Sequence, residues 1–182
     1  MKKEFSSAPE SMKTMDNWGV HWADLVTALP SPLFLVTAYK SNGQPNACLH
    51  SWACFNGNDS GFYAVLNFPT AALSEKYFAT VANNGFNTDE ITASGFTVEP
   101  AAIVNAPRIR ECFLNIECRF LWEREIKEGD YHVLMCLEAV NIAMDEDRLD
   151  ERKKGRYGET GYVYNVCGVV NPDNVDDQQD GI

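Results

Sequence analysis

The strongest indication of the fold lies in residues 113–143, whose sequence is FLNIECRFLWEREIKEGDYHVLMCLEAVNIA. In the first half of this stretch, apolar and polar side chains alternate, as they do in a strand with one face toward a core. The apolar residues on one face are Leu114, Ile116, Cys118, Phe120 and Trp122. The polar residues, mostly on the other face, are Asn115, Glu117, Arg119, Glu123 and Glu125.

A turn around Glu128, Gly129 and Asp130 returns the chain into residues 131–143. These residues are apolar almost throughout, so we expect the second strand to be buried on both faces. Together the two segments predict a long antiparallel hairpin.

Shorter strands are predicted before and after this hairpin. Residues 33–39 (LFLVTAY), 47–55 (ACLHSWACF) and 62–66 (FYAVL) are rich in β-branched and aromatic side chains. A turn at residues 41–43 separates the first two, and a polar loop at 56–61 separates the second and third. Residues 161–170 (GYVYNVCGVV) predict one last short strand.

Three helices are expected. The first is indicated by the spacing of Trp18, Trp22, Leu25, Val26 and Leu29, and prolines 30 and 32 stop it. The second starts at Thr70, with Leu73, Tyr77, Phe78 and Val81 on one face, and ends at Asn84-Gly85. A short third helix over 88–94 is closed by Gly95.

These elements predict a mainly β fold with short helices, in the form of an antiparallel β-barrel with helical covers. Strands and helices do not alternate regularly, which argues against a doubly wound nucleotide-binding fold. The length of 182 residues fits one domain, and we expect the polar ends, 1–15 and 173–182, to be flexible.

Charge and hydropathy narrow the possible functions. The chain carries 26 acidic and 15 basic residues and thus a net charge of −11. The electrostatic field of this negative charge repels the phosphate backbone of nucleic acids. An anionic cofactor would need a local pocket of backbone N–H groups or a few basic side chains. Apolar runs such as residues 33–36 are far too short to span a membrane, and no signal peptide is evident. We therefore expect a soluble cytoplasmic protein.

No sequence motif indicates covalent or metal chemistry. The chain contains no G-x-S-x-G, H-E-x-x-H, P-loop or G-x-G-x-x-G motif, and its three histidines are scattered. Its six cysteines form no C-x-x-C, so buried free thiols are expected: Cys48, Cys54, Cys112, Cys118, Cys136 and Cys167. We predict no catalytic side chain, which is compatible with redox chemistry carried by a cofactor.

Four segments in order resemble the flavin reductase-like, FMN-binding split-barrel family, of the flavoredoxin type. Residues 30–52 (PSPLFLVTAYKSNGQPNACLHSW) are similar to the family's opening strand, glycine turn, Pro-Asn-Ala and Ser-Trp. Residues 67–69 (NFP) resemble its Asn-hydrophobic-Pro step, and residues 88–97 (TDEITASGFT) resemble its Asp-Lys-Phe and Gly-Leu-Thr stretch. Residues 101–120 resemble its signature of valine, Ala-Pro, isoleucine and Leu-Glu-Cys.

The resemblance implies a split barrel that binds FMN without a covalent bond, as a homodimer with the flavin near the subunit interface. It implies an oxidoreductase that passes electrons from NAD(P)H through FMN to free flavin, a small acceptor or a redox protein. A non-enzymatic carrier of flavin or haem on the same shell is the alternative, because a fold does not fix a function.

The resemblance also implies where the flavin binds, with the strand over 47–55 beneath the isoalloxazine ring. Backbone N–H groups of this strand and the Ser51 hydroxyl would bond the polar edge of the ring. Asn46 would hold the turn, and Trp52 would pack beside the site or in the barrel core. The full expected cofactor-binding set is Asn46, Ala47, Cys48, His50, Ser51, Trp52, Ala53, Cys54 and Asn67.

Residue spacing places two cysteines of this set, Cys48 and Cys54, on one face of the strand with Asn46, His50 and Trp52. A thiol beside a flavin could modulate its potential or be redox active. Alternatively, both cysteines are small side chains that fill a barrel wall.

The chain departs from the family pattern at two places. Residues 62–66 run directly into Asn67, where the family carries a further strand end, a helix start and another strand that contact the FMN phosphate. Either this arm is lost, or a mobile segment belongs at that point. Glu90 stands where the family has a lysine, which removes one possible phosphate partner.

Overall fold

The computed structural model describes residues 31–51, 62–129, 133–146, 161–165 and 169–170. The helix expected near residues 18–29, the loop at 56–61, and the predicted site residues Trp52, Ala53 and Cys54 lie outside these ranges. None of the helices within the described ranges is long and apolar enough to cross a membrane.

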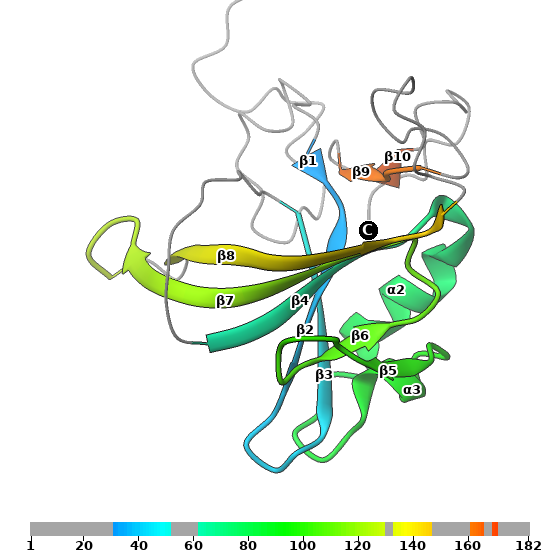
Figure 1. The fold of residues 1–182 in the computed structure, drawn as a ribbon, viewed down its shortest axis with the longest axis horizontal. Coiled ribbons are helices and arrows are strands. Elements are labelled where there is room, and N and C mark those ends of the chain that lie inside the picture. Colours follow the sequence, from blue (N-terminus) through cyan, green and yellow to red (C-terminus); the bar gives the residue numbers. More distant parts are fainter. Residues whose placement is uncertain (1–30, 52–61, 130–132, 147–160, 166–168, 171–182) are drawn as a thin grey trace, which may run out of the picture.

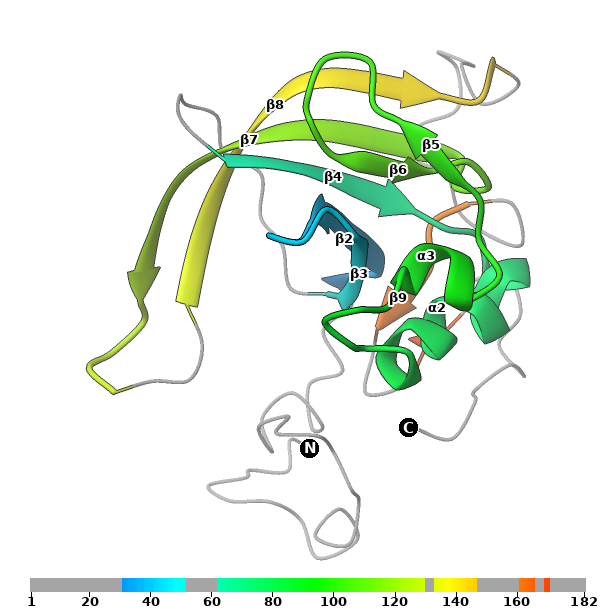
Figure 2. The ribbon, with the colours of Figure 1, turned by 90° about the horizontal axis from the view of Figure 1, so that it is seen from below.

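The fold is built on a five-stranded antiparallel sheet in the order β3-β2-β4-β7-β8. Its strands are β2 (Phe34–Tyr39), β3 (Pro45–His50), β4 (Phe62–Phe68), β7 (Leu114–Glu125) and β8 (Val133–Met144). The sheet curves so that β4, β7 and β8 arch over β2 and β3 (Figure 2). This mainly β, antiparallel architecture confirms the predicted fold class.

The long hairpin predicted over 113–143 is formed by β7 and β8, the two longest strands. Its register shifts between Glu117 and Cys118 and again between Phe120 and Trp122. Such β-bulges bend a strand and increase its twist. They also interrupt the simple alternation expected from the sequence. The far end of the hairpin projects beyond β4, as Figures 1 and 2 show.

The prediction that the second strand of this hairpin is buried on both faces is wrong. Val133 is 45% exposed, Leu134 49%, Met135 47% and Ile142 62%. The physical reason is position, because β8 is the last strand of the sheet and pairs only with β7 in the described part of the chain. Apolar composition alone does not distinguish a strand that is buried within the chain from one that exposes an apolar surface.

The turn between β2 and β3 is tight and matches the predicted turn at residues 41–43. The Lys40 N–H donates to the Gln44 carbonyl at 2.9 Å, and the Gly43 N–H donates to the Lys40 carbonyl at 2.9 Å. Gly43 has a φ of +82°, which a glycine adopts without the steric cost that a Cβ atom brings.

Two smaller sheets complete the strand inventory of the described ranges. One has the order β1-β9-β10, from β1 (Ser31–Pro32), β9 (Tyr164–Asn165) and β10 (Val169–Val170). The other is the hairpin of β5 (Val98–Pro100) and β6 (Pro107–Ile109). This hairpin was not predicted, because its strands have three residues each and both contain proline.

The helices pack against β3, beneath the arch (Figure 2). They are a 3₁₀ turn (Ala71–Leu73), α2 (Ser74–Ala82) and α3 (Glu90–Ala93). Thr70 precedes the 3₁₀ turn as expected, but its side chain makes no cap hydrogen bond. Val81, expected on the buried face, is 48% exposed. The core between helices and sheet is formed by Leu33, Leu35, Ala47, Tyr77, Ile91, Phe96, Ile109, Cys112 and Val163.

A second core lies on the opposite face of the sheet. Phe34, Phe68 and Leu66 meet residues of β7 there, and the Tyr162 ring packs edge-on against Phe68 at 5.6 Å between centroids. The two cores therefore use alternate residues of the same strands, as the pleat requires.

β4 runs without a break through Leu66 and Asn67, the point where the family pattern has additional residues. It pairs with β7 along its whole length, from Phe62↔Phe120 to Phe68↔Leu114, and Leu66 and Asn67 also pair with β2. In this fold the strand before the Asn-Phe-Pro step is thus complete on its own.

Candidate functional site

The outward face of β3 is the part of the predicted flavin site that the structure describes. Asn46, Cys48 and His50 alternate with Ala47 and Leu49, which turn toward the helices and the first core. Cys48 is exposed. Across the hairpin, these three residues pair with Ala38, Val36 and Phe34 of β2, in that order. Val36 and Ala38 thus place apolar side chains beside Cys48 and Asn46, and we call this surface of Asn46, Cys48 and His50 with Val36 and Ala38 the β3 shelf.

This shelf is uncharged at neutral pH. Burial raises the pKa of the Cys48 thiol above its ordinary value of 9.0, and the charge of Glu90 raises it further. The His50 ring stacks on Phe34 with 6.3 Å between centroids, and partial desolvation lowers its pKa below 6.5. Thiol and imidazole are therefore both neutral at pH 7. A neutral surface can receive the face of an aromatic ring without the desolvation penalty of a charge.

Ala47, another predicted site residue, contributes neither side chain nor backbone donor to this shelf. Its methyl group lies in the first core, at 2% exposure. Its N–H points away from β2 and donates to the Glu90 carboxylate, Oε2, at 3.0 Å. In an antiparallel pair every second residue directs its N–H away from the partner strand, so the next such group on this edge belongs to Leu49.

Asn67, a further predicted residue, lies on the other face of the sheet from Asn46, Cys48 and His50. It is fully buried, and its Nδ2 donates to the Leu35 carbonyl at 3.1 Å and to Thr37 Oγ1 at 2.9 Å. Its Oδ1 accepts the Ile109 N–H and Asn115 Nδ2, both at 2.9 Å. The structure thus places its amide in a network that joins β4, β2, β7 and β6.

The sequence analysis did not identify Glu117 as a buried group. Its carboxylate is fully buried and accepts the N–H groups of Ala102 at 2.8 Å, Ile103 at 2.8 Å and Val104 at 3.3 Å. Asn141 Nδ2 adds a fourth hydrogen bond at 2.9 Å. Burial alone would raise the pKa of Glu117, but these donors favour the ionised form and hold the pKa below 4.5. The carboxylate fixes residues 101–106 against the sheet.

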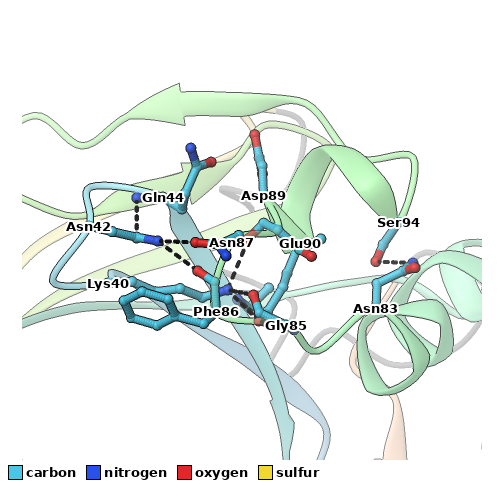
Figure 3. A network of polar contacts seen from close by, with 12 residues as sticks. Lys40, Asn42, Gln44, Asn83, Gly85, Phe86, Asn87, Asp89, Glu90 and Ser94 are labelled. Carbon is cyan, nitrogen blue, oxygen red and sulfur yellow. Dashed lines mark hydrogen bonds and ion pairs between the residues drawn. The ribbon is translucent and has the colours of Figure 1, made fainter.

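Glu90, at the position where the sequence resemblance implies a lysine, is also buried, at 1% exposure. Figure 3 shows Lys40 of the β2–β3 hairpin reaching into the segment that ends at Glu90. Lys40 Nζ is 2.6 Å from Glu90 Oε1 and donates to the carbonyls of Gly85 at 2.5 Å and Thr88 at 2.9 Å. The Gly85 N–H donates to the same Glu90 oxygen at 3.3 Å. An adjacent contact, from Asn42 Nδ2 to the Phe86 carbonyl at 2.8 Å, joins the same two segments.

The described residues form no candidate metal centre, since they contain no group of three or more His, Cys, Asp and Glu side chains placed to hold an ion. Four of the six cysteines lie in the described ranges, and all four are free thiols, as predicted. Cys112 and Cys118 are buried as expected, but the prediction of burial is wrong for Cys48, which is exposed, and for Cys136, which is half-buried. Burial raises the pKa of Cys118 to about 12, so this thiol is inert as a nucleophile.

Comparison with solved structures identifies the fold as the split barrel of flavin reductase-like proteins. A protein described as a flavin reductase with a split barrel domain, from Shewanella frigidimarina, aligns with a TM-score of 0.74 and 14% identity over 94% of this chain and 97% of that one. Flavoredoxin of Desulfovibrio vulgaris gives 0.66 and 19% over 91% and 88%.

An FMN-binding protein from Thermus thermophilus, with bound 1-cyclohex-2-enone, gives a TM-score of 0.61 and 13% identity over 94% of this chain and 96% of that one. No family model matches the sequence, and neither does any curated protein. At these identities the likeness extends to the fold, which agrees with the resemblance found in the sequence.

Proposed function

We propose that this chain is an FMN-dependent oxidoreductase with the flavin bound, without a covalent bond, against the outward face of β3. The observation that carries the proposal is the uncharged row of Asn46, Cys48 and His50 on one face of a strand of a split barrel. Proteins with the same fold include a flavoredoxin and an FMN-binding protein, which supports flavin as the ligand.

The residues of the shelf fit a flavin ring by their chemistry. Cys48 and the side chains of Val36 and Ala38 supply weakly polar and apolar contact, and the Asn46 amide and the imidazole of His50 supply hydrogen bonds at its margin. The edge N–H of Leu49 and the Ser51 hydroxyl are donors for the carbonyl edge of the ring, as the sequence resemblance predicts. Trp52, Ala53 and Cys54, which the sequence resemblance also implies as cofactor contacts, lie outside the described residues.

A bound flavin accepts a hydride from NAD(P)H and passes electrons onward. The chain's own contribution is to hold the ring flat, to donate hydrogen bonds where negative charge builds on reduction, and to keep ionised side chains off the shelf. No catalytic acid or base is required of the protein in this proposal.

The proposal includes a homodimer, formed through the projecting end of the β7–β8 hairpin. Its support is the exposed apolar row of Val133, Leu134 and Met135 on β8, next to the 40% exposed Trp122, which pairs with Cys136. Consecutive residues of a strand point to opposite faces, so β8 exposes apolar side chains on both faces of this arm, beside the charged residues 123–125 of β7. A surface of this kind on a soluble domain marks a contact site, and its position at the end of an arm suits an exchange of arms between two copies.

The proposed function is tested by titrating the purified protein with FMN and recording flavin absorbance and fluorescence. We expect stoichiometric binding, and anaerobic addition of NADH or NADPH should bleach the flavin bands. A Soret band on purification or on addition of haem would instead support the haem-carrier alternative. Failure to bind FMN would refute the proposal.

A further inference from the structure

The Lys40–Glu90 pair is the one described cluster of buried charge that touches the strand of the proposed flavin site. Glu90 lies at the first position of α3, and Lys40 lies at the end of β2. The Lys40 side chain is 10% exposed and the Glu90 side chain 2%, and Lys40 Nζ lies 2.6 Å from Glu90 Oε1. Burying an ion pair costs desolvation that its attraction alone seldom repays, so such a pair specifies a conformation more than it adds stability.

The hydrogen bonds of the pair show which conformation it specifies. Glu90 Oε2 accepts the edge N–H of Ala47, and Oε1 accepts the Gly85 N–H. Lys40 ties its own strand end to two carbonyls of the 85–88 segment. The pair therefore joins the first half of β3, the β2–β3 turn and the start of α3 in one arrangement (Figure 3).

The charge of Glu90 also reaches the shelf. It is the second cause, after burial, of the raised pKa of the Cys48 thiol, which lies one residue beyond Ala47 on the outward face. Lys40 compensates that charge from 2.6 Å. A group placed on the shelf thus experiences two opposed buried charges, and removing either one leaves the other unbalanced.

Resting on the proposed function, we propose that Lys40 and Glu90 are positioning residues of the flavin site. The pair anchors the edge of β3 at Ala47, so the donors presented to a flavin begin at Leu49, and it keeps the electrostatic potential at the ring neutral. Neither residue contacts the flavin. The Glu90 carboxylate, which stands in place of the family's lysine, is an internal anchor instead of a missing phosphate ligand.

The test uses Glu90→Gln, Lys40→Met and the double variant, with Glu138→Gln as the matched control. Glu138 pairs with Arg119 at 2.6 Å across the far edge of the same sheet. We expect the two single variants to bind FMN about tenfold more weakly than the wild type, and the control to stay within about twofold. The midpoint potential of bound FMN is then measured for each variant.

The two single variants should shift this potential in opposite directions. Glu90→Gln leaves the Lys40 charge, which stabilises the negative charge of reduced flavin and raises the potential, whereas Lys40→Met leaves the Glu90 charge and lowers it. The double variant should return close to the wild-type value. A purely structural disturbance would not change sign, so shifts of one sign, or none, would overturn the proposal.

Amide hydrogen exchange at Ala47 separates this proposal from the proposed function. In the protein without flavin, Glu90→Ala should speed exchange at Ala47 at least about tenfold more than Glu138→Ala does, because the amide loses its acceptor. If the wild type binds no FMN, the proposed function fails, while this measurement still decides whether the anchor exists. Unchanged exchange at Ala47 would refute the anchor even in a protein that binds FMN.

Discussion

Replacing Glu117 by alanine should destabilise this protein more than replacing any exposed acidic residue of the same hairpin. The substitution removes the acceptor of three backbone N–H groups, those of Ala102, Ile103 and Val104, and of the Asn141 amide. Hydrogen bonds to a charged group contribute ~1.5–3 kcal/mol each, and a buried donor left unpaired costs ~1–3 kcal/mol.

These contributions do not add, because water can reach part of the loop once the carboxylate is gone. Ile103 is 66% exposed, so its N–H can be rehydrated, whereas Val104 is 6% exposed and packs with Val65 and Ala106 in a small core. Counting one donor that stays unpaired, and partial losses at the others, gives a decrease in the free energy of unfolding of about 3 kcal/mol.

Urea unfolding of Glu117→Ala and of Glu138→Ala measures this difference. Glu138 forms a partly exposed pair with Arg119, and such pairs contribute about 0–1 kcal/mol. Amide exchange should accelerate at residues 102–104 in the first variant and not in the second. If the two variants unfold within about 1 kcal/mol of each other, the carboxylate does not hold the loop as the structure indicates.

Three further predictions concern the same framework. Asn67→Ala should lower the free energy of unfolding by about 2–4 kcal/mol in urea unfolding, because the Ile109 N–H loses its acceptor and Asn115 Nδ2 keeps only the Ile109 carbonyl; a loss below about 0.5 kcal/mol would contradict this. Because the pKa of Glu117 is lower in the folded state, its contribution to stability is complete above the unfolded pKa and is lost as the pH falls below about 4.5. The unfolding free energy of Glu117→Gln should therefore fall less between pH 6 and about pH 3 than that of the wild type, and equal slopes would argue against a depressed pKa. Leu134→Glu should convert a dimer to monomers in light scattering while the unfolding temperature of the monomer is kept, whereas Glu125→Gln on the same arm should leave the dimer intact.

The parts of the fold that could be predicted from the sequence are those in which local pattern and tertiary surroundings agree. The β2–β3 hairpin follows from an apolar strand and from Gly43 at a φ of +82°, and the β7–β8 hairpin follows from its length and alternation. The β5–β6 hairpin has no such pattern, because its three-residue strands are stabilised by contacts that lie far away in sequence, such as the bond from Thr37 Oγ1 to the Pro107 carbonyl.

Only the part of the candidate site that lies on one face of β3 could be predicted from the sequence, because strand alternation defines that face. Period two places Asn46, Cys48 and His50 together, and the structure keeps them together on one face of β3. Asn67 entered the predicted set through the resemblance alone. No spacing rule indicates that β4 directs this side chain to the opposite face, because strand alternation fixes relative faces within one strand and not between strands.

The two buried carboxylates have a common explanation. Glu117 lies between Ile116 and Cys118 on β7, and Glu90 lies before Ile91 at the start of α3. Alternation assigns Glu117 to the solvent, but residues 102–104 cover its face of the sheet. Each carboxylate accepts backbone N–H groups that need an acceptor, those of residues 102–104 at Glu117 and those of Ala47 and Gly85 at Glu90. An ionised carboxylate satisfies several donors at once, which no apolar or singly accepting side chain achieves. Only Glu90 has a lysine beside it in the described structure, and Glu90 is the carboxylate whose charge reaches the β3 shelf. Lys40 is therefore placed where the unbalanced charge of Glu90 would act on a flavin bound at the proposed site. The hydrogen-bond partners found for Glu117 include no cation, and that carboxylate organises a loop instead.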